Sequence, residues 1–365
     1  MKDAGSEGQA GPDPTRVRAL FPYLEEVVYL DTAAAGVSWK GQGAAAARFY
    51  DEHKSRGYGG SLLWRGELAR TRRLLSHLLQ VSPEQISFVA STTEALNLVA
   101  HGVRLGPGDQ VLLCDDEFPS ILLAWSPAAL REAELVRVPI RQETTRTDEL
   151  IERITERTRV VCVSHVHWCT GTRVDLDRIA AATHRVGARL VVDGAHATGA
   201  IEVNASEADI YTGPVFKWLL SGFGLAYVIT RASFAPELEP TFRGYHNEVS
   251  RNLQYGHANY PVMYALSATL ELLADLGWPW IHSRVSSLAS LLHEGLVQSG
   301  WTVVTPELQR AGIVSMVADD PNEVVASLAR QGVEIAERSG LLRISPHFYN
   351  TETDLQRLLT LLGTR

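Results

Sequence analysis

Short apolar runs alternate with helical stretches between about residues 31 and 229, and this alternation limits the possible folds more than any other feature. The strand-like runs cover residues 86–90, 110–114, 159–164, 189–192 and 225–229, and helical stretches such as 94–102 and 177–186 lie between them. This order predicts an α/β fold with a mostly parallel sheet and helices on both faces. Ligands of such sheets bind beyond the carboxyl ends of the strands, where Ser91, His165 and Asp193 fall.

The pattern changes after residue 232. Two long amphipathic segments, 263–276 and 281–299, are followed by short strand-like runs at 312–317 and 341–344. We therefore expect a large domain over residues 31–232 and a smaller C-terminal α+β domain over residues 233–365. The segment 16–30 is expected to pack on the small domain. Residues 1–15 are rich in Gly, Pro and acidic residues and are expected to form a disordered tail.

Composition narrows the classes of partner and compartment. The chain has 365 residues and a net charge of −8, which argues against nucleic acid or an anionic membrane as a partner. No apolar run of transmembrane length and no signal peptide is evident, so no membrane partner is expected. The spacing of Cys114, Cys162 and Cys169 suits neither a metal site nor a disulfide framework. We therefore expect no metal and a reducing, cytoplasmic location.

Two residues, an aspartate and a lysine near the ends of predicted strands, are the strongest candidates for catalysis. Asp193 ends a buried strand-like run, and Lys217 follows a second short run at residues 208–211. Each alone has an ordinary explanation, since an aspartate often caps a helix and a lysine is usually a solvated surface group. Together they meet the needs of pyridoxal 5'-phosphate (PLP). The acid keeps the pyridine nitrogen protonated, and the amine holds the aldehyde as a Schiff base.

The residues around this pair resemble a known family. Asp-Gly-Ala-His-Ala at 193–197, Lys-Trp-Leu-Leu at 217–220 and Arg-Ile-Ser-Pro-His-Phe-Tyr-Asn-Thr-Glu at 343–352 are similar to motifs of the class V aminotransferases, which are fold-type I PLP enzymes. That group includes isopenicillin N epimerase-like proteins, cysteine desulfurases and carbon–sulfur lyases. The motifs run in the same order from residues 29–33 to the last helix. The resemblance implies PLP as cofactor, a small-molecule amino-acid substrate and a homodimer with shared active sites.

The turn after residue 90 is expected to bind the cofactor phosphate. Ser91 and Glu94 form a capping-box pattern, which marks the start of a helix. The free N–H groups and the dipole at a helix N-terminus suit a phosphate, and Thr92 and Thr93 add hydroxyl groups. Many helices begin in this way without binding a ligand, so the resemblance to the family's phosphate-binding turn gives the motif its weight.

Two departures from the family concern the same phosphate. The family's usual Ser-Gly-His before the lysine is replaced by Pro214, Val215 and Phe216, whose side chains cannot donate a hydrogen bond. His257 stands where the family has a threonine that reaches the phosphate of the neighbouring subunit. Its imidazole would compensate as a donor there; the alternative is a surface histidine on a loop.

The resemblance also implies contacts to the cofactor ring and the substrate. Phe118 is expected to stack on the ring, with a core phenylalanine at a strand end as the alternative. His165 and Trp168 would line the site. His196 would reach the cofactor's phenolic oxygen or the substrate, where an imidazole suits proton transfer near neutral pH. Arg343 would form a two-pronged contact with the substrate's α-carboxylate.

The expected reaction follows from these roles. An external aldimine would form with the amino acid, and the freed Lys217 would remove the Cα proton. Transamination or epimerisation of an α-amino acid in secondary metabolism is the first expectation. Elimination or replacement at Cβ or Cγ is the alternative, and a non-catalytic PLP-binding or scaffold protein is the alternative of another class. A persulfide-forming desulfurase is disfavoured, because the stretch 331–340 before Arg343 contains no cysteine.

Overall fold

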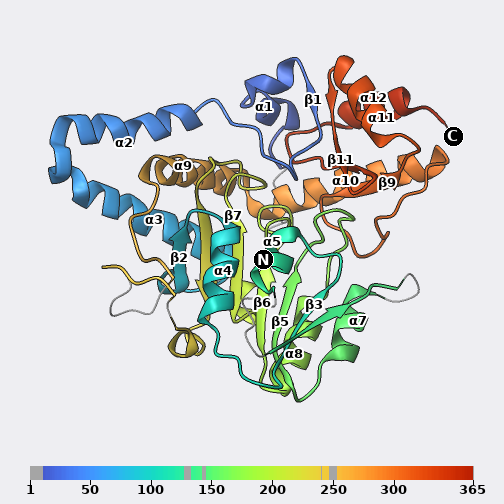
Figure 1. Ribbon diagram of the computed structural model, residues 1–365. Coiled ribbons are helices and arrows are strands. Elements are labelled where there is room, and N and C mark those ends of the chain that lie inside the picture. The colour runs from blue at the N-terminus through green and yellow to red at the C-terminus, as the bar shows by residue number, and fades with distance from the viewer. Residues whose placement is uncertain (1–10, 127–132, 142–144, 240, 246–252, 365) are drawn as a thin grey trace, which may run out of the picture.

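The computed structural model describes residues 11–126, 133–141, 145–239, 241–245 and 253–364. At its centre lies a sheet in the strand order β2-β8-β7-β6-β5-β3-β4 (Figure 1). The strands are β2 (Ile86–Val89), β3 (Gln110–Cys114), β4 (Glu134–Val138), β5 (Thr158–Ser164), β6 (Arg189–Asp193), β7 (Ile210–Pro214) and β8 (Ala226–Thr230). Strands β7, β6, β5, β3 and β4 are parallel, and β8 is antiparallel to both of its neighbours. The predicted mostly parallel sheet is confirmed.

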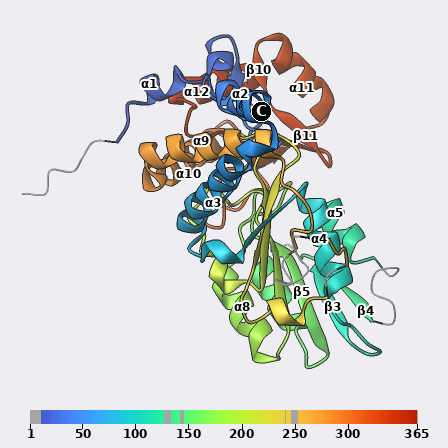
Figure 2. The same ribbon diagram turned by 90° about the vertical axis from the view of Figure 1, so that its left-hand side faces the viewer.

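Helices cover both faces of this sheet, as Figure 2 shows with the sheet seen nearly on edge. Helices α4 (Thr92–Gly102) and α5 (Pro119–Ala124) lie on one face, and α3 (Ser61–Leu79), α7 (Arg146–Arg153) and α8 (Leu176–Arg185) lie on the other. Neighbouring strand residues divide between the two cores. Val161 and Val163 pack with α3 and α8, whereas Val160 and Cys162 pack with α4. Continuous apolar runs are therefore needed, because each strand is buried on both faces.

The C-terminal elements form a smaller unit with the N-terminal segment. Strands β11 (Ala336–Arg338), β12 (Leu341–Ile344) and β9 (Val314–Val317) make an antiparallel sheet, and β1 (Val28–Tyr29) pairs in parallel with β10 (Val333–Glu334). Val28 and Leu30 share a buried core with α10 (Trp278–Gln298) and α12 (Glu352–Leu362). Helix α11 (Pro321–Arg330) lies beside this sheet at the top of Figure 1.

The expected limits of the tail and of the large domain differ from what the packing shows. Helix α1 (Pro14–Arg18), capped by Asp13, begins inside the stretch expected to be a tail, and residues 1–10 lie outside the described residues. Helix α9 (Tyr260–Leu276) comes after residue 232, yet Met263 and Leu266 belong to the core that includes the central sheet. Periodicity identifies such a helix but does not say which sheet it covers.

Helices α2 (Gln42–Arg56) and α3 form an extended arm at the left of Figure 1, and α9 lies against both of them. Within the described ranges, no helix is long and apolar enough to cross a membrane.

Candidate active site

A cavity of about 270 Å³ opens at the carboxyl ends of the parallel strands. Strands β5, β6 and β7 end beside it, and the helices that follow β2 and β3 complete its wall. Most of the side chains predicted from the sequence line this cavity: Ser91, Thr92, Thr93, Phe118, Trp168, Asp193, His196 and Lys217.

Asp193 and Lys217 meet because β6 and β7 are neighbours. Asp193 lies opposite Thr212 in the parallel register, and the turn after β7 carries Lys217 back to the same edge. Burial raises the pKa of the Asp193 carboxyl to about 6 and lowers the pKa of the Lys217 amine to about 8. The lysine is therefore partly neutral near physiological pH, which is the form that acts as a nucleophile or a base.

His196 lies between Lys217 and the buried side chain of Trp218 and contacts both. Its Nε2 lies 3.2 Å from Lys217 Nζ, and its Nδ1 accepts a hydrogen bond of 3.5 Å from the Trp218 indole. Burial holds the pKa of the His196 imidazole well below its ordinary value, so the ring is neutral at pH 7. The neutral ring is in hydrogen-bonding contact with Lys217 and Trp218, and the proton-transfer role expected from the sequence stays a prediction. The sequence does not reveal this burial.

The start of α4 differs in one detail from the predicted capping box. Ser91 Oγ accepts a hydrogen bond of 3.1 Å from the Glu94 N–H, as expected. The Glu94 carboxylate, however, accepts from the Ala90 N–H at 2.6 Å instead of from Ser91. The helix N-terminus is capped, and its first turn faces the cavity through Thr92 and Thr93.

Hydroxyl groups gather at this end of the cavity. Thr92 Oγ1 is buried and has no hydrogen-bond partner among the described residues. Thr93 Oγ1 lies 2.8 Å from Ser120 Oγ. The sequence does not predict Ser120 at the site, because it belongs to α5 and the contact joins two different helices. A phosphate fits these groups, since it supplies the acceptors that they lack. Pro214 and Phe216 make the adjoining wall apolar.

Aromatic side chains form the remaining wall. Phe118 is 36% exposed, and its ring packs edge-on against Trp168 with centroids 5.6 Å apart. Lys217 Nζ lies 5.8 Å from the Phe118 ring centroid and 5.9 Å from that of Phe216. Phe118 is therefore a wall of the cavity, positioned to contact a planar ring near the lysine.

The structure places two predicted site residues elsewhere. Side chains alternate at the end of β5, so Ser164 and Val166 line the cavity while His165 does not. His165 Nδ1 lies 3.1 Å from the Tyr211 hydroxyl, and the ring borders a separate cavity of about 640 Å³. His257 is exposed and borders a third cavity.

Arg343 lies just behind the cavity wall. It is 2% exposed, and one Nη donates to the Trp168 carbonyl at 3.0 Å. The other Nη donates to the Asp31 carboxylate at 3.1 Å. Asp31 lies in the motif at 29–33, but the sequence assigns it no role, because it is 312 positions away from Arg343 in the chain.

A second buried charged group supports the β5 edge. Glu117 is 2% exposed and accepts hydrogen bonds from the Ser164 N–H at 3.0 Å and the Ser164 hydroxyl at 2.5 Å. Beside it, Arg146 donates two hydrogen bonds to Asp116, at 2.8 and 2.6 Å. These contacts hold the strand end next to Asp193. No cluster of His, Cys, Asp and Glu that could hold a metal ion occurs in the described residues.

Comparisons with known proteins agree with this geometry. The family model described as aminotransferase class-V matches residues 28–358. The isopenicillin N epimerase of Amycolatopsis lactamdurans is 30% identical over 81% of this chain and 83% of its own length. An uncharacterized aminotransferase of Bacillus subtilis (strain 168), YcbU, is 24% identical over 95% of this chain and 96% of its own. Other relatives are named probable cysteine desulfurases.

Solved structures show the same fold. A mutant of C-DES, with glycine covalently linked to its PLP cofactor, superposes with a TM-score of 0.88 at 23% identity, covering 96% of this chain and 99% of that one. The family match extends over most of the chain and includes Asp193, Lys217 and Arg343. This protein belongs to the class V aminotransferase family.

Proposed function

We propose that this PLP-dependent enzyme removes the Cα proton of an α-amino acid, and that the outcome is transamination. One observation carries the proposal: a buried lysine with a lowered pKa lies beside a buried acid, in a cavity whose wall contacts Arg343. These are the groups needed to hold the cofactor, take the proton and orient the substrate's carboxylate.

The residues around the cavity fit PLP part by part. When bound, PLP supplies an electron-accepting ring that stabilises negative charge at Cα. Asp193 would pair with the ring nitrogen. Because the carboxylate is buried, water would not compete with the ring nitrogen for this contact. Thr92 and Thr93 would receive the phosphate at the α4 N-terminus, and Phe118 would pack against the ring.

Lys217 would act in two roles in this cavity. Its amine would hold the cofactor, and once released it would take the proton from Cα of the substrate. A pKa of about 8 suits this task, because a base works best when its pKa is near the working pH. His196, being neutral, would hold the lysine through the contact of 3.2 Å. Arg343 would orient the substrate's carboxylate.

The choice of transamination over epimerisation rests on the proton carriers in the cavity. Lys217 is the only amine among the described lining residues, and the neutral His196 is in contact with it. One lysine that removes and returns a proton is sufficient for transamination. Two-base epimerisation needs a second carrier facing Cα. Epimerisation remains the second candidate, supported by the relative named isopenicillin N epimerase.

Cysteine-based desulfuration has less support. The structure brings Cys169 next to the stretch that lacks a cysteine in sequence, with its Sγ donating to the Arg338 carbonyl at 3.2 Å. The thiol is 4% exposed, and burial raises its pKa. A reactive cysteine needs an accessible thiolate, so Cys169 is a poor persulfide carrier. Elimination at Cβ or Cγ does not need this group and is the third outcome to test.

We expect the reaction to be identified by its products. PLP-loaded protein should be incubated with each of the common amino acids in deuterated water, with Lys217→Ala as control. Transamination yields a 2-oxo acid and the aminated cofactor; epimerisation yields the opposite enantiomer carrying deuterium at Cα; elimination yields a 2-oxo acid, free ammonia and the protonated group released from Cβ or Cγ. Failure to exchange the Cα hydrogen of any amino acid would contradict the proposal.

The lowered pKa of Lys217 predicts how attachment depends on pH. Only the neutral amine attacks the aldehyde, so the rate at which PLP attaches to cofactor-free protein should rise about tenfold per pH unit below pH 7 and level off above about 8. Stopped-flow absorbance measures this rate. A rate that keeps rising to pH 10 would indicate an ordinary lysine.

The Thr92 hydroxyl, which has no hydrogen-bond partner among the described residues, predicts a loss of cofactor affinity that is specific to the phosphate. Thr92→Val keeps the shape of the side chain but removes the donor, so PLP should bind about tenfold more weakly. Pyridoxal, which has no phosphate, should bind as in the wild type. Thr360→Val, on an exposed part of α12, is the matched control. Equal losses for both ligands would rule out the phosphate contact. Equilibrium titration monitored by fluorescence gives the affinities.

We also propose a homodimer in a reducing cytoplasm. Ser91 and Thr93, at the edge of the cavity, are exposed, and so is His257. This exposure is consistent with a dimer in which each active site includes residues of the partner subunit. All three cysteines are buried and unbridged, as a reducing compartment allows. Light scattering after size-exclusion chromatography should give twice the chain mass of 40.1 kDa. The mass of one chain would contradict the dimer.

A further inference from the structure

The surroundings of Arg343 leave one edge of its guanidinium unused. Each of its two Nη groups has its own acceptor, the Trp168 carbonyl at 3.0 Å and Asp31 Oδ1 at 3.1 Å. Its Nε is buried and has no hydrogen-bond partner among the described residues. An unpaired N–H on a buried cation is unfavourable, so an acceptor is expected at this edge.

Asp31 is fixed by the same strand that carries Arg343. Its backbone bridges to Ser345, just beyond the end of β12, and the Ser345 N–H donates to the Leu30 carbonyl at 2.7 Å. The Asp31 carbonyl accepts from the Tyr29 hydroxyl and the Ala34 N–H, both at 3.0 Å. The relative position of the carboxylate and the guanidinium is therefore set by the backbone.

We propose that Asp31 is a positioning residue that, with the Trp168 carbonyl, holds the Arg343 guanidinium so that its Nε edge receives the substrate's α-carboxylate. A guanidinium can bind a carboxylate through both Nη groups or through Nε and one Nη. Each Nη donates one of its two N–H groups to a separate acceptor, so Nε–H and the second N–H of the adjoining Nη form the edge left for a ligand. This inference rests on the proposed function.

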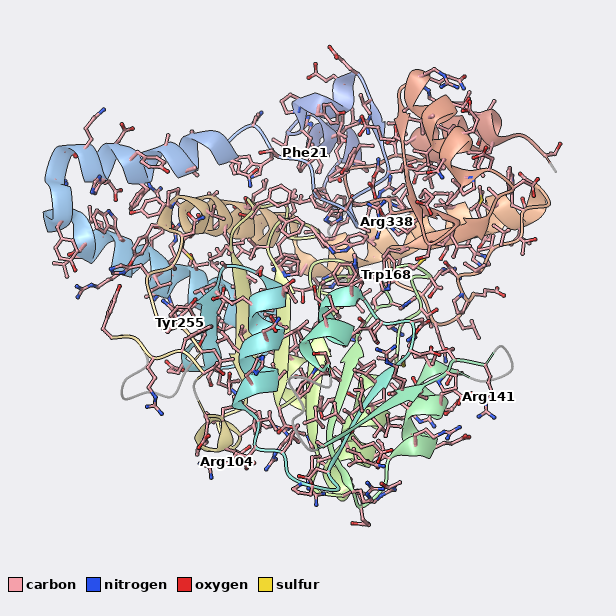
Figure 3. All side chains as sticks on the ribbon, viewed as in Figure 1. Phe21, Arg104, Arg141, Trp168, Tyr255 and Arg338 are labelled. Carbon is pink, nitrogen blue, oxygen red and sulfur yellow. The ribbon has the colours of Figure 1, made fainter. Side chains whose placement is uncertain are left out.

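The local charges can accommodate a second carboxylate. Arg338 acts electrostatically on both Asp31 and Arg343. Figure 3 shows Arg338 and Trp168 at the junction between the central sheet and the smaller unit. A substrate carboxylate would therefore join two cations and one anion. Trp168 also lines the cavity, so the group that holds Arg343 borders the space for the substrate.

The test compares an acid with its amide. The PLP-loaded wild type, Asp31→Ala and Asp31→Asn are titrated with the amino acid that gives the largest absorbance change and with its carboxamide. The readout is the ratio of the two dissociation constants, which does not depend on the fraction of folded protein. We expect the wild type to favour the acid and Asp31→Ala to lose about tenfold or more of this preference. Asp31→Asn keeps an acceptor oxygen and should stay within about threefold.

The other outcomes separate this inference from the proposed function. A wild type that does not favour the acid would contradict the carboxylate role of Arg343 itself. With that preference intact, three results would overturn the role of Asp31. They are tighter binding of the acid by Asp31→Ala, equal weakening of acid and amide, or the same loss of preference in Asp31→Asn as in Asp31→Ala. The first would mean that Asp31 competes with the substrate.

Discussion

The parallel pairing of β6 with β7 is the contact on which the site depends. It sets Asp193 opposite Thr212, so that the turn carrying Lys217 returns beside the acid. Both groups are then deprived of water, and burial moves their pKa values toward each other, to about 6 and about 8. The pKa values of a carboxyl group and an amine differ widely in water. Here they lie close together, because burial disfavours the charged form of each group.

Under the proposed function, the opposite end of the substrate would be held by parts of the chain that are far apart in sequence. Asp31 comes from the N-terminal segment, Trp168 from the loop after β5 and Arg343 from β12. Asp31 and Arg343 meet because β1 pairs with β10, and because Asp31, which follows β1, forms a β-bridge with Ser345 just beyond the end of β12. The packing of the N-terminal segment on the smaller unit is thus also a condition for binding a carboxylate.

Local features could be predicted from the sequence. Strand β3 coincides with the apolar run at 110–114, since a strand buried on both faces needs continuous apolar residues, and β12 coincides with the strand-like run predicted at 341–344. Asp193 and Lys217 were found because strand ends are where ligands of parallel sheets bind. Contacts between segments that are distant in the sequence could not be predicted from it. Examples are the contact of Thr93 with Ser120 and the ion pair of Asp31 with Arg343. His165 was misplaced because the face on which a side chain emerges changes with each residue.

The most direct test locates the cofactor on the chain. The sequence has four lysines, Lys2, Lys40, Lys54 and Lys217, of which Lys40 and Lys54 are exposed and Lys217 is buried in the cavity. Borohydride reduction of PLP-loaded protein makes the carbon–nitrogen bond permanent, and peptide mass spectrometry then identifies the modified lysine. The account predicts one pyridoxyl group per chain, on Lys217. Modification spread over the other lysines, with Lys217 unmodified, would contradict it.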